Sequence, residues 1–293
     1  MDLRALAMGL LFALIWSSAF TSARIIVEAA PPLMALSLRF FLSGVLGIGI
    51  ALAMGQNFRL TRVQWVSVLV FGICQNALYL GLNFIAMQTV EASLAAIIAS
   101  TMPLLVAAAS WLVFRERLPL LGVAGLVVGF GGVALIMAQR FSGGADMFGV
   151  ALCLVGSVAL TAATLVVKGA SKDGANLLMI VGLQLMVGSL ALAPFAAVFE
   201  TYQVSWSTSL VVAFLYTTLM PGLFATFIWF RLVGRMGATR AATFHFLNPF
   251  FGVAIAAILL GEALTWADAL GVTVIAAGIL AVQMARQRPR PAP

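Results

Sequence analysis

Four hydrogen-bonding side chains lie close together inside one long apolar stretch of the sequence: Gln75, Asn76, Tyr79 and Asn83. At the helical repeat of about 100° per residue, all four fall within an arc of about 100°. Polar groups in a membrane helix avoid lipid, so such a face either bonds to a neighbouring helix or lines a wet cavity. Because the four groups spread over two turns, we expect a cavity and a contact with substrate.

Three further polar side chains and one tryptophan are candidates for the same cavity. Arg39 lies inside an apolar stretch, where its guanidinium either reaches the membrane surface or points inward and attracts a carboxylate; we expect the inward position. His245, the only histidine, shares a helical face with Asn248, and both a packing role and a role in the cavity are open. Trp16 shares a face with Phe20 and is expected to wall the cavity.

The residue patterns that most enzymes and pumps need are missing from the sequence. No acidic residue lies deep in an apolar stretch, and no His, Cys or carboxylate groups stand at metal-ligand spacing. There is neither a phosphate-binding glycine loop with its lysine nor a nucleophile with an adjacent base. Cys74 and Cys153 lie in apolar stretches and predict no disulfide. The sequence therefore predicts a protein that is not an enzyme and uses no metal or cofactor.

The composition places these candidates in a membrane. The chain is 63% hydrophobic and 9% charged, with a mean hydropathy of +1.13, whereas a soluble protein is about 25% charged. Its apolar stretches are about 20 residues long, which is the length of a helix that crosses a bilayer. The sequence thus predicts an all-α integral membrane protein with ten transmembrane helices. The expected spans are residues 6–26, 33–54, 63–87, 92–114, 118–137, 148–167, 176–199, 209–230, 241–260 and 266–284.

The second half of the chain repeats the first at an offset of 146 residues. Each half has five spans, an odd number, so the second copy enters the membrane in the opposite direction. The sequence therefore predicts two inverted-topology repeats, which in secondary transporters place the substrate site near the midplane between them. We expect the first repeat at residues 1–140, the second at 145–286 and a basic tail at 287–293. The matched pairs are Pro103 and Pro249, Glu116 and Glu262, Gly125 and Gly271, and Gly132 and Gly278.

The matched residues have different expected roles. The two glutamates each precede a new span and are expected to cap helix N-termini, and the glycines are expected to let helices pack closely. The prolines lie mid-span and can kink a helix, which either shapes packing or exposes carbonyl groups to a cavity. Gln75 and Asn76 align with Pro221 and Gly222, which should bend that span at the same depth. Matched interruptions of this kind point to a transport site.

Lysine and arginine are distributed unevenly between the two sides of the expected membrane. Of the 16 cationic residues, 13 lie at the termini or in even-numbered loops, and two, Arg24 and Arg140, lie on the opposite side. Since cationic loops stay in the cytoplasm, both termini are expected there. The net charge of +7 thus indicates topology rather than binding of nucleic acid.

Several segments are similar to one group of transporters. They are LIWSSAF around Trp16, LSLRFF around Arg39, ASLAAIIASTMPLLVAAASWLVFRERL in the first half and GATRAATFHFLNPFFGVAIAAILLGEAL in the second. On these segments the sequence resembles the drug/metabolite transporter superfamily, in its ten-helix EamA-type branch, over essentially the whole chain. Its closest likeness there is to bacterial exporters of amino acids, of the aromatic type. The resemblance implies one central cavity, export by alternating access and a multi-pass protein of the bacterial cytoplasmic (inner) membrane.

The sequence therefore predicts a secondary transporter that exports amino acids, aromatic ones included, or related small metabolites. A largely neutral cavity with one arginine suits a zwitterion better than a sugar phosphate, which would need several cations. Efflux of amphipathic drugs is the alternative, and a lipid scramblase or a receptor is a further class that the interior position of the polar residues disfavours. The expected partners are a small-molecule substrate and the lipid bilayer, without nucleic acid. A monomer is expected, and a homodimer is left open.

Overall fold

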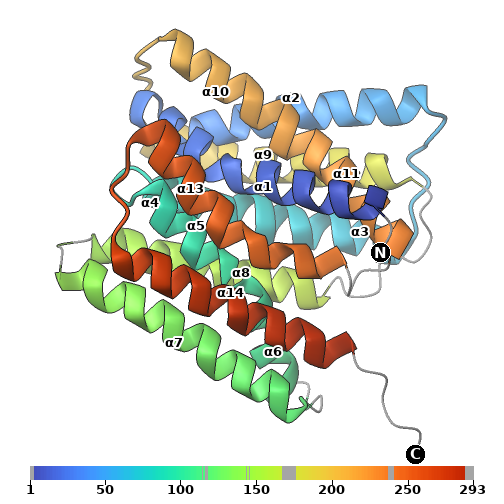
Figure 1. The fold of residues 1–293 in the computed structure, drawn as a ribbon. Helices are drawn as coiled ribbons and strands as arrows, with labels where there is room; N and C mark the ends of the chain where they lie inside the picture. Colours follow the sequence, from blue (N-terminus) through green and yellow to red (C-terminus); the bar gives the residue numbers. More distant parts are fainter. Residues whose placement is uncertain are drawn as a thin grey trace, which may run out of the picture.

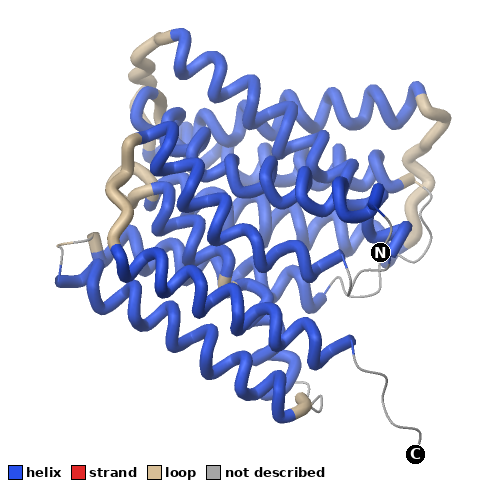
Figure 2. The backbone as a smooth tube through the Cα atoms, in the orientation of Figure 1, coloured by secondary structure: helices blue, strands red, loops and turns tan. Residues whose placement is uncertain are grey.

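The structure of the protein is a computed structural model, which describes residues 3–113, 115, 118–142, 144, 146–166, 176–236 and 241–287. Every regular element within these ranges is a helix, and short loops connect the helices (Figure 2). Nine helical stretches in the described part are long and apolar enough to cross a membrane, and Phe244–Leu260 is a shorter apolar one. They coincide with the ten expected spans, so the chain is an all-α membrane protein with ten transmembrane helices.

Among the described residues, six spans are each formed by one helix and four are divided into shorter helices. The undivided helices are α1 (Leu3–Ala29), α2 (Pro32–Ala53), α7 (Leu120–Ser142), α8 (Met147–Val166), α9 (Leu177–Phe199) and α14 (Trp266–Gln287). The divided spans consist of α3 (Arg62–Val70), η1 (Phe71–Leu80) and α4 (Gly81–Ala86); α5 (Ala92–Ser100) and α6 (Met102–Leu112); α10 (Thr208–Leu219), η2 (Met220–Phe224) and α11 (Ala225–Met236); and η3 (Ala242–Leu247) and α13 (Asn248–Leu260).

The helices lie roughly side by side, with their long axes in a common direction (Figure 1). Helix α1 runs through the middle of the bundle, where it contacts α13, α10 and α11. Helices α7 and α14 form a pair along one edge, and α2 lies toward the opposite edge (Figure 1). The start of α1 and the end of α14 are on the same side of the bundle (Figure 1).

The most extensive helix contact joins α7 to α14, which are equivalent helices of the two halves. A Cβ added to Gly278 would lie 2.5 Å from the Cα of Gly129, and one added to Gly125 would lie 2.8 Å from the carbonyl oxygen of Gly278. A Cβ on Gly132 would lie 3.0 Å from the carbonyl oxygen of Gly271. Glycine is needed for so close an approach. Along this contact the residue numbers of α7 rise as those of α14 fall, so the two equivalent helices are antiparallel.

Helices α2 and α9 are a second pair of equivalent helices in contact. The Ser37 hydroxyl donates to the carbonyl oxygen of Ser189 at 3.0 Å, and the Ser189 hydroxyl donates to that of Ser37 at 2.9 Å. A Cβ on Gly44 or on Gly182 would lie 3.1 Å from the carbonyl oxygen of the other glycine. This pair is also antiparallel. The halves therefore meet through equivalent helices that run in opposite directions.

Carboxylates from the second half cap helices of the first half. Glu262 accepts hydrogen bonds of 2.8 and 2.9 Å from the first two backbone amides of α5. Glu262 therefore does not cap α14, the helix that follows it in the sequence. The N-terminus of α14 is capped by Thr265 and Asp268, each of which donates its backbone amide to the side chain of the other. Glu200 caps the first turn of α2 in the same way, at 2.7 and 2.8 Å. The other expected cap, Glu116, lies outside the described residues.

Candidate substrate cavity

A small cavity lies between α1, α2, η1, α4 and η2. Its volume is about 50 Å³, which is room for a few water molecules, whereas sites for drug-sized ligands measure about 300–1,000 Å³. A molecule of the size of an amino acid therefore needs the surrounding helices to move apart. The lining residues are Trp16, Ala19, Phe20, Ala23, Arg39, Tyr79, Leu80, Asn83, Phe84, Met87 and Pro221.

Helix α1 provides one wall of this cavity. Trp16 and Phe20 are four residues apart and so lie one above the other on one face of the helix. Ala19 and Ala23 continue this wall and leave the space between the larger rings open. The predicted place of Trp16 on the wall agrees with this arrangement.

Arg39 is the cation of the cavity wall. Its side chain is only 6% exposed, and its Nε atom has no hydrogen-bond partner in the described part of the chain. The guanidinium carbon of Arg39 lies 5.1 Å from the centroid of the Phe40 ring. No acidic side chain of the described residues forms an ion pair with Arg39. A buried cation without a counter-charge is costly, so this site favours a ligand that brings a negative charge.

Only two of the four polar residues of the third span line the cavity. Tyr79 and Asn83 are both there, and the Asn83 Nδ2 donates to the Tyr79 carbonyl oxygen at 2.8 Å while its Oδ1 has no partner among the described residues. Asn76 instead donates to the Gln184 carbonyl oxygen of α9 at 2.9 Å. Gln75 is half-buried and is not part of the lining. Two of the four predicted side chains therefore line the cavity, and the other two do not.

Residues 71–80 form a π-helix, whose i→i+5 hydrogen bonds give each turn more residues than an α-helix has. Each residue therefore turns the helix by less than 100°, which moves Asn76 away from the face that Tyr79 and Asn83 share. The sequence predicted matched interruptions in the two halves. The segment η2, which contains Pro221 and Gly222, is also π-helical, so the helix is irregular at both places.

The backbone groups that η2 disturbs are satisfied by nearby hydroxyl groups. The Ser43 hydroxyl donates to the carbonyl oxygen of Thr218 at 3.0 Å, and the Thr226 hydroxyl donates to that of Gly222 at 3.0 Å. Irregular backbone at membrane depth is tolerated when such partners are present. Pro221 can therefore face the cavity without leaving buried carbonyl groups unpaired.

The two mid-span prolines also lie at helix interruptions. Pro103 is near the start of α6, directly after the break at Thr101, and Pro249 is near the start of α13, directly after the 3₁₀ helix η3. Neither proline lines the cavity. Pro249 matters for the site because the helix change beside it sets the position of His245 and Asn248.

His245 and Asn248 do not line the cavity but lie beside it. The imidazole of His245 is surrounded by what we call the aromatic cage, the rings of Phe12, Trp16 and Trp229, at centroid distances of 5.4, 6.5 and 5.1 Å. The Nδ1 atom of His245 is 2.9 Å from the Nδ2 atom of Asn248. Along α1 the cage includes residue 12 and the cavity includes residues 19–23, with Trp16 common to both. The cage therefore adjoins the cavity on the side where α1 begins.

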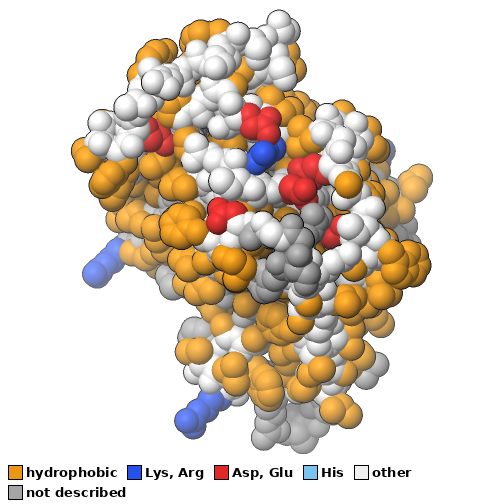
Figure 3. All heavy atoms as spheres, turned by 90° about the vertical axis from the view of Figure 1, so that its left-hand side faces the viewer, with side chains coloured by type: hydrophobic (Ala, Val, Ile, Leu, Met, Phe, Trp, Pro, Cys, Tyr) orange, Lys and Arg blue, Asp and Glu red, His pale blue; other side chains and the backbone are white. Residues whose placement is uncertain are grey.

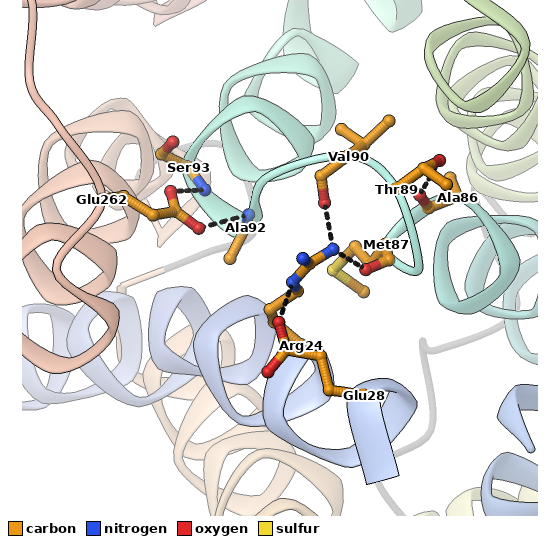
Figure 4. A network of polar contacts seen from close by, with 9 residues as sticks. All are labelled: Arg24, Glu28, Ala86, Met87, Thr89, Val90, Ala92, Ser93 and Glu262. Atoms are coloured by element: carbon orange, nitrogen blue, oxygen red, sulfur yellow. Dashed lines mark hydrogen bonds and ion pairs between the residues drawn. The ribbon is translucent and has the colours of Figure 1, made fainter. Parts of the chain in front are cut away.

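Arg24 follows the cavity wall of α1 at its other end and contacts the end of the third span (Figure 4). Its guanidinium, at the far end of α1, donates to the carbonyl oxygen of Met87 and, at 3.3 Å, to that of Val90. It also forms an ion pair of 2.6 Å with Glu28. Met87 ends the third span and lines the cavity. These contacts therefore tie α1 to the third span beside the cavity.

The surface at this end is acidic. Figure 3 shows acidic side chains on this face, several of them around one basic side chain. Asp146 accepts a hydrogen bond of 2.5 Å from the Thr89 hydroxyl and others from the amides of Phe148 and Gly149, and these bonds hold the pKa of its carboxyl below its usual value. The acidic residues within the described ranges all lie at this end; they are Glu28, Glu91, Asp146, Glu200, Glu262 and Asp268.

Several residues of the site were not among those predicted. The four-residue spacing of Phe12, Trp16 and Phe20 is a signal that could have added Phe12 to the site, because it places the three rings on one helix face. Phe84 and Met87 carry no such signal, since apolar residues fill every span. No group of three or more possible metal ligands occurs in the part of the chain that the structure describes.

Residues 3–138 and 147–284 each match the EamA-like transporter family. Among curated proteins, YvbV, an uncharacterized transporter of Bacillus subtilis (strain 168), is 28% identical over 272 residues, which cover 92% of this chain and 88% of YvbV. The uncharacterized inner membrane transporter YedA of Escherichia coli (strain K12) is 26% identical over 286 residues, 95% of this chain and 90% of YedA. A crystal structure with 22% sequence identity has the same fold, with a TM-score of 0.69 over 99% of this chain and 100% of that chain. Because the two matches cover nearly all of both halves, this chain belongs to the EamA-like transporter family and is a multi-pass membrane transporter, not an enzyme.

Proposed function

We propose that this transporter exports amino acids with apolar or aromatic side chains, or related small metabolites that carry a carboxylate. The observation that carries the proposal is the unpaired guanidinium of Arg39 in a cavity walled by aromatic rings. A carboxylate would neutralise Arg39 through charge-assisted hydrogen bonds. The rings of Trp16, Phe20 and Phe84 would hold an apolar side chain, and the free Oδ1 of Asn83 would accept a hydrogen bond from the ammonium group.

Alternating access is the proposed mechanism. Two antiparallel halves that meet through equivalent helices can exchange conformations, which gives two states of comparable energy that open on opposite sides. In this mechanism the aromatic cage and the Arg24 contacts close the two ends of the cavity. If one end opens while the other stays closed, the substrate meets one side of the membrane at a time.

The proposed location is the bacterial inner membrane, with both termini in the cytoplasm. The connection between α2 and α3 lies on the side where α1 begins (Figure 1). It contains Arg59 and leads to Arg62, the first residue of α3, whereas the described acidic residues lie at the other ends of the helices. Cationic segments remain in the cytoplasm during insertion, which supports this orientation. The aromatic cage would then face the cytoplasm, and Arg24 would face the periplasm.

Flux through proteoliposomes tests the proposal. Vesicles that contain the purified transporter are loaded with radiolabelled phenylalanine, leucine or glycine, and efflux is measured with and without an excess of unlabelled competitor. We expect saturable efflux of the first two. Arg39→Gln should reduce it about tenfold or more, because a hydrogen bond to a charged group contributes about 1.5–3 kcal/mol, and Arg39→Lys should restore part of it.

Arg59→Gln is the matched control, because Arg59 is exposed and far from the cavity. Its flux should equal that of the unmodified protein. Amino-acid flux that is unchanged in Arg39→Gln would contradict the assigned role of Arg39. If instead amphipathic drugs are transported and no amino acid is, the alternative of drug efflux replaces the proposed substrate class.

A further inference from the structure

The aromatic cage holds His245, the only histidine of the chain. Histidine is the residue whose side chain ordinarily gains or loses a proton between about pH 5 and pH 8. Binding an amino acid does not require a histidine outside the cavity. The cage is also not explained by packing alone, because three large rings surround a polar ring that has one recorded hydrogen bond.

The side chain of Asn248 can serve both protonation forms of this histidine. It is 8% exposed, its Nδ2 lies 2.9 Å from the Nδ1 of His245, and its Oδ1 has no partner among the described residues. With a neutral imidazole, Nδ2 donates to Nδ1. When Nδ1 carries a proton, a half-turn of the amide brings Oδ1 into place to accept from it.

The cage is connected to the cavity through Trp16, whose ring belongs to both. Charging the imidazole weakens the apolar packing around it, because an ion is costly to bury among hydrocarbon groups. A change in the cage therefore moves a wall of the substrate cavity. The helix that carries His245 changes from 3₁₀ to α at Asn248, so the backbone there is interrupted and can adjust.

The other charged groups on the elements packed around His245 leave it as the site for a proton. None of them has a recorded contact with the imidazole: Arg231 lies over the ring of Phe227, Arg24 and Glu28 pair with each other, and Asp268 binds Thr265. The charged residues whose side chains are described are Arg4, Arg24 and Glu28 of α1, Arg231 and Arg235 of α11, and Asp268 of α14. The side chain of Arg286, also on α14, lies outside the described part.

We propose that His245 binds the proton whose inward movement drives export. The inference rests on the proposed function for its substrate. Proton binding at Nδ1 forms an imidazolium, turns the Asn248 amide and loosens the cage; release of the same proton on the other side restores the neutral ring and closes the cage. No covalent bond other than N–H forms or breaks, and one positive charge enters for each proton carried.

The single histidine allows a direct test. The protein, purified with a tag that contains no histidine, is labelled with ¹⁵N-histidine, so that one imidazole is observed by NMR as the pH is varied. We expect it to titrate, and we expect tryptophan fluorescence to fall over the same pH range because a protonated imidazole quenches the indole rings beside it. In His245→Gln the fluorescence change should disappear, and in Asn248→Leu the midpoint should move to lower pH because the cation loses its acceptor.

Transport gives the second readout. An inward pH gradient should increase amino-acid flux several-fold in the unmodified protein and leave flux unchanged in His245→Gln, whose folding is verified by its thermal melting. An imidazole that does not titrate, or a His245→Gln variant that keeps its response to the gradient, would overturn the proposal. If no amino acid is transported, the proposed substrate fails, whereas the NMR and fluorescence titrations still decide whether His245 binds a proton beside the cavity.

Discussion

Arg39 and Asn83 each keep a buried polar atom, the Nε and the Oδ1, for which the described part of the chain offers no partner. Leaving such an atom unsatisfied costs about 1–3 kcal/mol. Both side chains line the same cavity, so the protein tolerates two such costs at one place. Hydroxyl groups of Thr21, Ser93 and Ser110 are also unpaired, but none of them lines the cavity. We infer that ligand binding supplies the partners that Arg39 and Asn83 lack.

The two asparagines of the third span should respond in opposite ways to replacement by leucine. Asn83→Leu removes the unpaired Oδ1, so the melting temperature should stay the same or rise, whereas the KM for the amino acid should rise about fivefold or more with loss of one hydrogen bond of about 1 kcal/mol. Asn76→Leu removes the bond to Gln184 and crowds Gly188, so the melting temperature should fall. Melting in detergent and flux in vesicles measure both effects. A lower melting temperature with unchanged KM in Asn83→Leu would contradict a role in binding.

At the scale of the elements, the closely packed helices and the irregular helices lie in different parts of the bundle. The pair of α7 and α14 is fixed by glycines that bring the two backbones into contact. The cavity is instead bordered by η1 and η2, where the hydrogen-bonding pattern changes. Elements that move are drawn from those with weaker local order. We therefore expect α7 and α14 to act as a support while the divided helices around the cavity change shape.

The glycine contact can be tested with a matched pair of substitutions. Gly278→Ala places a Cβ 2.5 Å from the Cα of Gly129, so the helices must separate, at a cost of about 1–3 kcal/mol. Gly131→Ala on α7 adds a Cβ that meets no atom within 4 Å. The melting temperature should fall by several degrees in the first variant and stay unchanged in the second. Equal melting of the two variants would show that the helices are not in close contact there.

The sequence was sufficient to predict the spans, because the length of an apolar stretch is set by the thickness of the bilayer. The glycine and proline positions followed from the offset of the two halves. The side chains around the cavity were harder to predict, because a π-helix changes the angle between successive residues, as Asn76 shows. The partners of Arg24 and of Glu262 could not be predicted, since both bind backbone groups that are distant in the sequence.

At the scale of the whole molecule, different chemistry borders the two ends of the cavity. The cytoplasm-facing closure in the proposed orientation is an aromatic cage, which depends on packing. The opposite closure is an arginine held by two carbonyl groups and one carboxylate. Protonation would loosen the aromatic cage, whereas replacement of the arginine would loosen the opposite end. The two ends can therefore be opened separately by experiment.

Opening the Arg24 end should expose the cavity. In a variant in which Cys74 and Cys153 are replaced by alanine, Ala23→Cys places a thiol in the cavity wall. Adding Arg24→Gln removes the bonds that tie α1 to the third span, so a membrane-impermeant maleimide applied from that side should label the thiol several-fold faster. Arg62→Gln, at the opposite end, is the control and should leave the rate unchanged. Equal labelling with and without Arg24 would contradict its role in the closure.

The acidic surface around Arg24 also affects the orientation of dipolar molecules that approach it. Within about 8 Å, the screening length in physiological salt, a dipolar molecule turns in the field of these carboxylates so that its ammonium group leads. In the proposed binding mode the carboxylate must lead, because it pairs with Arg39. We therefore expect an amino acid that has left by this end to return in the orientation that the cavity does not accept. Rebinding is slowed relative to release, and this asymmetry fades as the ionic strength rises.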